Sequence, residues 1–423
     1  MRVLVKCKPS VLRRVPPSRR VLAICGDSQV GCWLVRSLGR GGLAVFSVVR
    51  SAHGQAAHSR FSSGAYVLDS RTPSDTFMDE LDTLARMLNV GSIMAISETH
   101  HAVLVPHRDR FEPSIHVFSP STECFAKATD KDEMQSLCRR LGVPVAKGTT
   151  LNRLMADGGD SLRFPLVLRT RSQNDRSAKR APWKAAYAED AAGLDRLHEQ
   201  VREIADNIVV QEYHPGVEDH VQILMHEGEA FMVGDYIGEH HMPLAGGVTV
   251  QRVSCHHEGL VHDAVRLLKA LDWQGIAGVQ FHYDPETDEY IFLEINPRFI
   301  GGLPTVIRAG FDAPFLLWQS HFEPEKMRRS RYKKGLRTRI LGGDANWMLG
   351  MIRGDQLPPG QKRLGKLTAA AKFLWNCGPW TRDDSFWLRD PKPFFVDLQQ
   401  MIKKLGAESF DILGSVESQE SPR

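Results

Sequence analysis

The residues with the clearest capacity for chemistry lie in two segments that the pattern predicts to be paired strands. The first runs from Gly278 to Asp284 and the second from Tyr290 to Asn296, with a polar loop, Pro285 to Glu289, between them. Two such runs joined by a short polar loop are typical of a β-hairpin. Side chains alternate across a strand. We therefore expect Ile291, Leu293 and Ile295 on the buried face, and Phe292, Glu294 and Asn296 on the other.

The exposed face of this hairpin offers oxygen ligands. Glu294 and Asn296 project side by side, and Gln280 can reach them from the paired strand. Pro297 ends the ladder, so Arg298 lies just past the strand. Mg²⁺ takes one or two protein carboxylates and completes its octahedron with phosphate oxygens and water. The set therefore indicates a site for a Mg²⁺-bound triphosphate, and the alternative is an ordinary amphipathic strand with a solvated polar face.

The hairpin also resembles a known family. The run from Leu293 to Arg298 is similar to the metal-binding signature of the ATP-grasp superfamily, and Gly278 to Phe281 resembles the carbamoyl-phosphate synthase version, where the first ligand is Gln. Asp130 to Val145 resembles the first segment of the ATP-grasp domain. Phe164 to Arg169 is similar to its phosphate-binding strand, and Val209 to Gly216 to its adenine hinge. The pieces occur in family order.

The resemblance implies roles for individual residues. Glu294, Asn296 and Gln280 would hold one or two Mg²⁺ (or Mn²⁺) ions between the β- and γ-phosphates of ATP. Arg298 would bind phosphate and acyl-phosphate oxygens, a bidentate task suited to a guanidinium. Further ATP contacts are implied for Lys131 in the first helix, for Arg169 and Lys184 as phosphate clamps, for Gln211, Glu212 and Tyr213 at the adenine, and for Glu218 or Asp219 at the ribose. Arg298 and Lys184 are the predicted catalytic residues.

The activity that the resemblance implies is that of an ADP-forming ligase. A carboxylate would attack the γ-phosphate of ATP to give an acyl phosphate, and an amine or another nucleophile would then displace phosphate.

A competing interpretation is a regulatory nucleotide-binding protein without turnover. Ser172 to Arg180 favours the latter, because it has no glycine where many relatives cover the phosphates with a Gly-rich loop. Thr170 to Pro182 is polar and unpatterned and is predicted to be a mobile loop. The acid and the acceptor cannot be deduced from the sequence.

The elements that carry these residues predict an α/β protein. Strand-like runs at 21–24, 43–49, 66–68 and 92–96 alternate with helical stretches, which is typical of a parallel sheet flanked by helices. The turn that follows the first run lacks a full dinucleotide fingerprint, so NAD binding is not expected. We predict a basic leader at 1–18, a Rossmann-like domain at 19–120, an ATP-grasp domain at 121–323 (small lobe about 121–210, large lobe about 211–323), and a C-terminal extension of unassigned role at 324–423, helical or irregular and separate.

Composition sets limits on location and partners. The 423 residues are 42% hydrophobic and 25% charged, which is typical of globular domains. The net charge of +4, from 54 basic and 50 acidic residues, is too balanced to indicate nucleic acid or an anionic membrane. No apolar run approaches the ~20 residues of a membrane span. We expect a cytoplasmic protein with small-molecule partners, and a homo-oligomer is compatible with the sequence.

Cysteine and histidine spacing gives no sign of a second metal site. The 7 cysteines are scattered and never form a C-x-x-C pair, which argues against both a disulfide framework and a zinc cluster. Adjacent histidine pairs such as His240-His241 and His256-His257 diverge on a strand, whereas zinc ligation favours i, i+4 or hairpin spacing. These histidines are expected to be ordinary surface residues.

Overall fold

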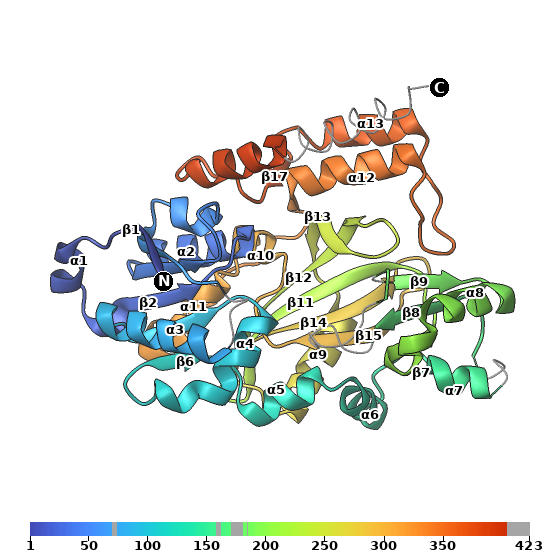
Figure 1. The fold of residues 1–423 in the computed structure, drawn as a ribbon, viewed down its shortest axis with the longest axis horizontal. Helices are drawn as coiled ribbons and strands as arrows, with labels where there is room; N and C mark the ends of the chain where they lie inside the picture. The colour runs from blue at the N-terminus through green and yellow to red at the C-terminus, as the bar shows by residue number, and fades with distance from the viewer. Residues whose placement is uncertain (70–73, 158–161, 171–180, 184, 404–423) are drawn as a thin grey trace, which may run out of the picture. The chain divides into compact units, whose positions relative to one another are not determined.

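The computed structural model describes residues 1–69, 74–157, 162–170, 181–183 and 185–403 (Figure 1). The α/β class predicted from the sequence is confirmed. No helix in these described ranges is both long and apolar enough to cross a membrane. The chain forms two compact units. Unit 1 comprises Met1–Ile96, Arg108–Val117 and the described part of Asp383–Arg423, and unit 2 comprises Ser97–His107 and Phe118–Arg382.

Unit 1 is built on the predicted parallel sheet. Its strands follow the order β1-β4-β3-β2-β5-β6, and β4, β3, β2 and β5 are parallel. Every residue of β2 and β3 is buried, as expected where both faces of a parallel sheet are covered. The elements are β1 (Arg2–Val5), α1 (Pro9–Arg14), η1 (Pro17–Arg19), β2 (Arg20–Ile24), α2 (Gln29–Arg40), β3 (Ala44–Val49), η2 (Gln55–His58), β4 (Ser62–Val67), α3 (Ser74–Leu88), β5 (Ser92–Ala95), η3 (Val105–Arg110) and β6 (His116–Phe118).

The first residues are not the loose leader that the sequence predicted. Strand β1 pairs antiparallel with β4. The buried guanidinium of Arg20 donates to the carbonyl oxygens of Leu12 at 2.5 Å and Val15 at 2.8 Å. These carbonyls lie at the C-terminal end of α1, where a cation is favourable. The Arg20 side chain thus fixes the end of α1, although the many basic residues of this segment had suggested that it is unstructured.

The end of the described chain packs on α2 within unit 1. The indole nitrogen of Trp33 donates to the carbonyl of Asp384 at 2.5 Å, and Arg36 forms a buried ion pair with Asp390 at 2.9 Å. The Trp387 ring lies 5.9 Å from that of Trp33. The last described helix covers residues 392–403. This part of the predicted C-terminal extension is therefore integrated into the fold.

Unit 2 contains a small antiparallel sheet in the order β7-β10-β8-β9. Leucines of α7 and α8 form one core with Leu166 and Leu168 of the sheet. The elements are β7 (Gly148–Thr150), α7 (Leu151–Ala156), β8 (Leu166–Thr170), β9 (Ala185–Ala188), α8 (Ala191–Val201), η4 (Arg202–Asn207) and β10 (Ile208–Glu212).

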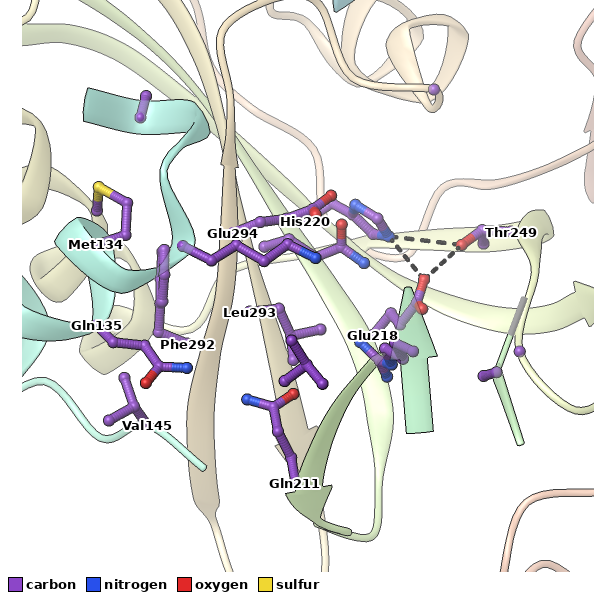
Figure 2. Close-up of a pocket in the computed structure, with 18 of the residues that line it drawn as sticks. Met134, Gln135, Val145, Gln211, Glu218, His220, Thr249, Phe292, Leu293 and Glu294 are labelled. Atoms are coloured by element: carbon purple, nitrogen blue, oxygen red, sulfur yellow. Dashed lines mark hydrogen bonds and ion pairs between the residues drawn. The ribbon is translucent and has the colours of Figure 1, made fainter. Parts of the chain in front are cut away.

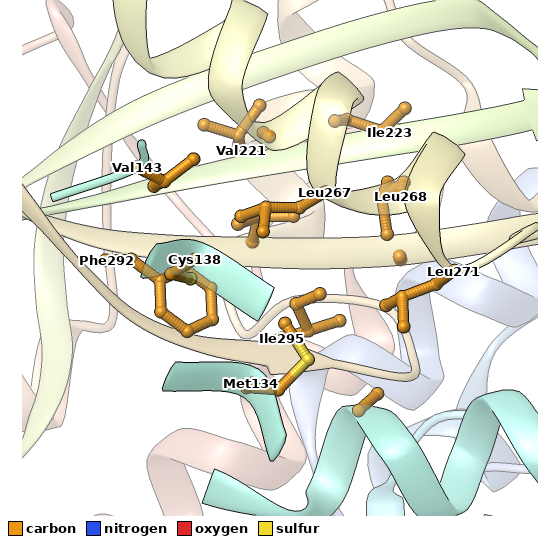
Figure 3. Packing of buried hydrophobic residues seen from close by; sticks show 14 of the residues in the cluster. Met134, Cys138, Val143, Val221, Ile223, Leu267, Leu268, Leu271, Phe292 and Ile295 are labelled. Carbon is orange, nitrogen blue, oxygen red and sulfur yellow. The ribbon is translucent and has the colours of Figure 1, made fainter. Parts of the chain in front are cut away.

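A larger sheet in unit 2 has the order β15-β14-β11-β12-β13-β16-β17. Helix α9 (Glu258–Ala270) covers one face, and Leu267 and Leu268 pack there against Val221 and Ile223 (Figure 3). The strands are β11 (Val217–His226), β12 (Glu229–Met242), β13 (Val248–Cys255), β14 (Gly275–Asp284), β15 (Glu289–Asn296), β16 (Arg337–Arg339) and β17 (Thr381–Asp383). Further helices are α4 (Glu98–Leu104), α5 (Thr122–Thr129), α6 (Lys131–Leu141), α10 (Leu303–Ala309), α11 (Ala313–Phe322), η5 (Pro324–Lys326), α12 (Leu341–Arg353) and α13 (Lys366–Trp375).

Helix α6 is capped at both ends by residues of its own sequence. The Asp130 carboxylate accepts from the backbone N–H groups of Asp132 at 2.9 Å and Glu133 at 3.0 Å, satisfying donors that have no partner within the helix. Gly142 ends the helix with a φ of 71°, a conformation that favours glycine. These caps fix the position of Lys131 in the first turn.

The segment after residue 323 is not the separate appendage that the sequence predicted. Strand β16 extends the large sheet by pairing with β13. The ring of His240 on β12 stacks on Trp347 of α12 at 3.5 Å. The buried carboxylate of Asp344 contacts His240 Nδ1 at 2.6 Å and accepts from Arg339 at 3.0 Å. This buried network joins the C-terminal helices to the sheet, and His240 is a core residue rather than the surface histidine expected.

Candidate active site

A cavity of about 490 Å³ lies within unit 2 (Figure 2). Its walls come from α6, from both sheets and from the glycine-containing turn before β13. Seven of the residues assigned from the sequence line this cavity, namely Lys131, Arg169, Gln211, Glu218, Gln280, Glu294 and Arg298. The structure thus brings together residues from four separate segments of the chain.

The predicted hairpin carries the acidic group of the cavity. Strands β14 and β15 pair antiparallel, and Gln280 lies opposite Glu294. The amide of the buried Asn296 donates to Glu294 Oε1 at 3.1 Å, so the two residues share a face as predicted. Carboxylate and amide oxygens are the hard donors that suit Mg²⁺. The donor set of Glu294, Gln280 and Asn296 therefore fits the ion.

The alternation predicted for the rest of β15 is wrong. In the register, Gln280 faces Glu294 while the next residue of β14, Phe281, faces Phe292. Leu293 is thus the extra residue of a β-bulge, which reverses the side-chain alternation before it. Phe292 consequently joins Ile295 in the hydrophobic core, and Leu293 lines the cavity beside Glu294.

Three cations, Lys131, Arg169 and Arg298, line the cavity together with this carboxylate. Burial lowers the pKa of Lys131, the Glu294 carboxylate partly opposes this effect, and the charge of Arg169 adds to it. All three charged groups line the same cavity. Arg298 also lines the cavity, with Nη1 donating to the carbonyl of Phe299 at 2.9 Å. A cluster of cations around one carboxylate suits a phosphate chain with a bound metal.

Glu218 anchors a second polar group in the cavity. Its Oε2 lies 3.3 Å from His220 Nε2, 3.5 Å from His241 Nε2 and 3.4 Å from Thr249 Oγ1. Figure 2 shows the triangle of contacts among Glu218, His220 and Thr249. Burial would raise the pKa of Glu218, but the hydrogen bonds and charges of the two histidines hold it well below its usual range. The carboxylate therefore stays ionised as a strong acceptor.

Sequence reasoning missed part of this wall. His220 and Thr249 line the cavity, as does Tyr236, whose ring stacks on His220 at 4.8 Å. One signal for His220 was present, because it stands two residues from Glu218 on the same strand and so shares its face. Tyr236 and Thr249 carried no comparable signal, since only strand pairing brings them there.

The turn before β13 closes another side of the cavity. Gly246 and Gly247 both line it. A Cβ at Gly247 would lie 2.1 Å from the carbonyl oxygen of Met242, so the turn requires glycine. The hydroxyl of Tyr187 on β9 donates to the carbonyl of Ala245 at 2.7 Å and ties the turn to the small sheet.

Some predicted site residues do not line the cavity. The backbone N–H of Glu212 donates to Lys147 O and that of Tyr213 to Pro165 O, both at 2.9 Å, so these donors are already used. Asp219 is fully buried on the opposite face of β11 from Glu218. Lys184 and the glycine-free segment from Ser172 to Arg180 lie outside the described residues.

Comparison with known proteins agrees with this architecture. A family model described as "ATP-grasp in the biosynthetic pathway with Ter operon" matches residues 205–342. The N-terminal section of the carbamoyl phosphate synthase large chain from Methanopyrus kandleri is 23% identical over 202 residues, covering 44% of this chain and 34% of the relative. The chain thus spans about a third of that relative's length.

Solved structures share the fold at low sequence identity. Biotin carboxylase from Campylobacter jejuni superposes with a TM-score of 0.59 at 16% identity, covering 75% of this chain and 74% of that one. N5-carboxyaminoimidazole ribonucleotide synthetase gives 0.58 at 14% identity, with 86% and 98% covered. L-amino acid ligase from Bacillus licheniformis gives 0.54 at 15%, with 72% and 74% covered. The chain therefore shares the ATP-grasp fold of these structures, and residues 205–342 match the family model named for the Ter operon.

Proposed function

We propose that the protein is an ATP- and Mg²⁺-dependent ligase that activates a carboxylate as an acyl phosphate. The observation that carries the proposal is the joint placement of Glu294, Lys131, Arg169 and Arg298 around one cavity. A triphosphate needs cations along its oxygens and a carboxylate to hold its metal. The family resemblance and the relatives described above support the same reaction class.

Binding is assigned to residues of both lobes. Lys131 and Arg169 neutralise phosphate oxygens from the side of α6 and the small sheet. Lys184 is assigned as a further phosphate-binding residue. Glu218, ionised in the free protein, accepts hydrogen bonds from the ribose hydroxyls. Gln211 lies at the adenine end together with the adjoining hinge residues. Nucleotide is thus held between the small lobe, about 121–210, and the large lobe, about 211–323.

Catalysis in this proposal depends on positioning and charge. Glu294, Gln280 and Asn296 hold Mg²⁺, which when bound neutralises phosphate charge. Arg298 orients the γ-phosphate toward the substrate carboxylate, whose oxygen attacks phosphorus while ADP leaves. An amine or another nucleophile then attacks the acyl carbon and releases phosphate, and the amine loses its proton. Such a reaction needs no nucleophile from the protein.

A substrate screen tests the proposal. Purified protein with Mg²⁺ and ATP is incubated with a panel of carboxylic acids and hydroxylamine as a generic acceptor, and ADP, phosphate and hydroxamate are measured. A ligase should form ADP and hydroxamate with a subset of acids, and the trapped hydroxamate identifies the acid. Tight ATP binding without ADP release under any condition would instead favour the regulatory alternative. Absence of ATP binding would contradict both.

A further inference from the structure

A second group of ligating side chains lies on the face of the large sheet opposite the cavity. On β11, Glu218 and His220 line the cavity, and Asp219 between them points to the other face. On β12 the same alternation sets Tyr236 in the cavity wall and the neighbouring Asp235 on the far side. The two carboxylates therefore meet behind the candidate active site.

Four potential ligands from four elements converge there. One atom from each of Asp219, Asp235, Cys255 and His257 lies within 4.8 Å of the others. His257 Nδ1 is 2.7 Å and Cys255 Sγ 3.5 Å from Asp219 Oδ2, and the backbone N–H of His257 donates to Asp235 Oδ2 at 2.9 Å. Cys255 ends β13 and His257 caps α9. The side chains are separated in sequence and are brought together by strand pairing.

The two carboxylates of this group are buried and incompletely satisfied. Asp219 and Asp235 are both 0% exposed. Among the described residues, Asp219 Oδ1 has no hydrogen-bond partner, and Asp235 Oδ1 has only the ring of His256 at 3.5 Å. Buried carboxylate oxygens without partners are costly unless a proton or a cation satisfies them.

We propose that Asp219, Asp235, Cys255 and His257 form a binding site for one Zn²⁺ ion. Thiolate and imidazole favour zinc over Mg²⁺ or Ca²⁺, which prefer oxygen ligands alone. Four protein ligands with none left open are typical of a structural zinc site. Tetrahedral coordination at ~2.0–2.3 Å places ligand atoms roughly 3.3–3.8 Å apart, so a pair at the 4.8 Å limit would close by about 1.0–1.5 Å.

The position of the site gives the ion a structural role. It would tie β11, β12 and β13 to the start of α9, directly behind Glu218 and Tyr236. The side chain of His257 is 23% exposed, which provides a route for the ion. This inference does not depend on the proposed ligase reaction, because it concerns a different face of the sheet and other side chains.

Zinc binding to the full-length protein tests the site. Protein stripped with a chelator is titrated with Zn²⁺ against a chromophoric competitor, and bound metal is measured by mass spectrometry. We expect one tightly bound equivalent. Cys255→Ser should weaken binding by about tenfold or more, since even the partners of zinc ligands contribute that much. Cys124→Ser is the matched control, because Cys124 is a partly exposed thiol of the same unit that contacts the carbonyl of Leu271 at 3.1 Å.

Two further measurements test the zinc site independently of the Cys255→Ser variant. Glu294→Gln should bind zinc like the wild type, which separates this site from the nucleotide metal. Co²⁺ added to wild-type protein should give a thiolate-to-metal charge-transfer band and the strong visible absorption of a tetrahedral ion, even if Cys255→Ser does not fold. The proposal is overturned if the wild type binds no zinc, if Cys255→Ser and Cys124→Ser bind alike, or if Co²⁺ shows no thiolate band.

Discussion

Replacing Glu294 by glutamine should abolish turnover and leave the protein folded. The side chain is exposed in the cavity, and its Oε1 accepts a hydrogen bond from Asn296 at 3.1 Å. A glutamine oxygen at this position can accept the same bond, and the residue opposite is already the neutral Gln280. An exposed substitution of equal size should change the free energy of unfolding by no more than about 0.5 kcal/mol.

The catalytic cost follows from the lost charge. In the proposed site Glu294 is the carboxylate that would hold Mg²⁺, and the variant would leave the ion with amide oxygens and water. Metal stabilisation of transferring charge is worth several kcal/mol. A loss of about 4 kcal/mol corresponds to roughly a thousandfold in rate, at 1.36 kcal/mol per factor of ten. The variant also removes the charge that supports the protonated form of Lys131, so the pKa of that lysine should fall further.

The assay is ADP release with Mg²⁺, ATP and the acid identified by hydroxamate trapping. Glu289→Gln is the matched control, because Glu289 is an exposed carboxylate on the same strand, paired with Asp284 and away from the cavity. It should keep wild-type activity. Near-normal ADP release by Glu294→Gln would refute the assignment of the metal to this strand. The residues would then form only a solvated strand face.

Three other substitutions, one of them with a matched control, probe other features of the structure. Arg298→Lys should keep one cation but lose the bidentate fork, so kcat/KM should fall about tenfold to a hundredfold, the effect of one charged hydrogen bond worth ~1.5–3 kcal/mol. Asp344→Asn should lower the free energy of unfolding in urea by about 3 kcal/mol, because it leaves a buried guanidinium without its counter-charge. Gly302→Ala should cost about 1–3 kcal/mol and lower the Tm, since the new Cβ would lie 2.2 Å from the Tyr236 ring, whereas Gly301→Ala, with nothing within 4 Å, should not.

The parts of the structure that the sequence predicted are those governed by local pattern. The buried runs of β2 and β3 and the caps of α6 are encoded in neighbouring residues, so the parallel sheet and this helix could be assigned directly. Glu294 and Asn296 could be placed on one face because they are two residues apart on a strand. These residues also carry the family resemblance.

The parts that it missed depend on pairing between distant segments. The bulge at Leu293 exists only because β15 holds one more residue than β14 at that point, which no alternation within β15 reveals. His240 and Asp344 are 104 positions apart, and each taken alone is a common surface residue type. The sequence therefore predicted a separate C-terminal segment, although the contact between His240 and Asp344 joins this segment to the sheet.

Asp219 illustrates the same limit at the level of function. Alternation establishes that Glu218 and Asp219 cannot both face the nucleotide, but it does not say which of them does. The answer depends on which face of β11 is covered by α9, and the packing of Val221 and Ile223 under that helix assigns Asp219 to the covered face. A carboxylate there does not line the candidate active site and must be satisfied by protons, donors or a metal. The choice between two adjacent acids thus decides whether the residue belongs to the proposed nucleotide site or to the proposed zinc site.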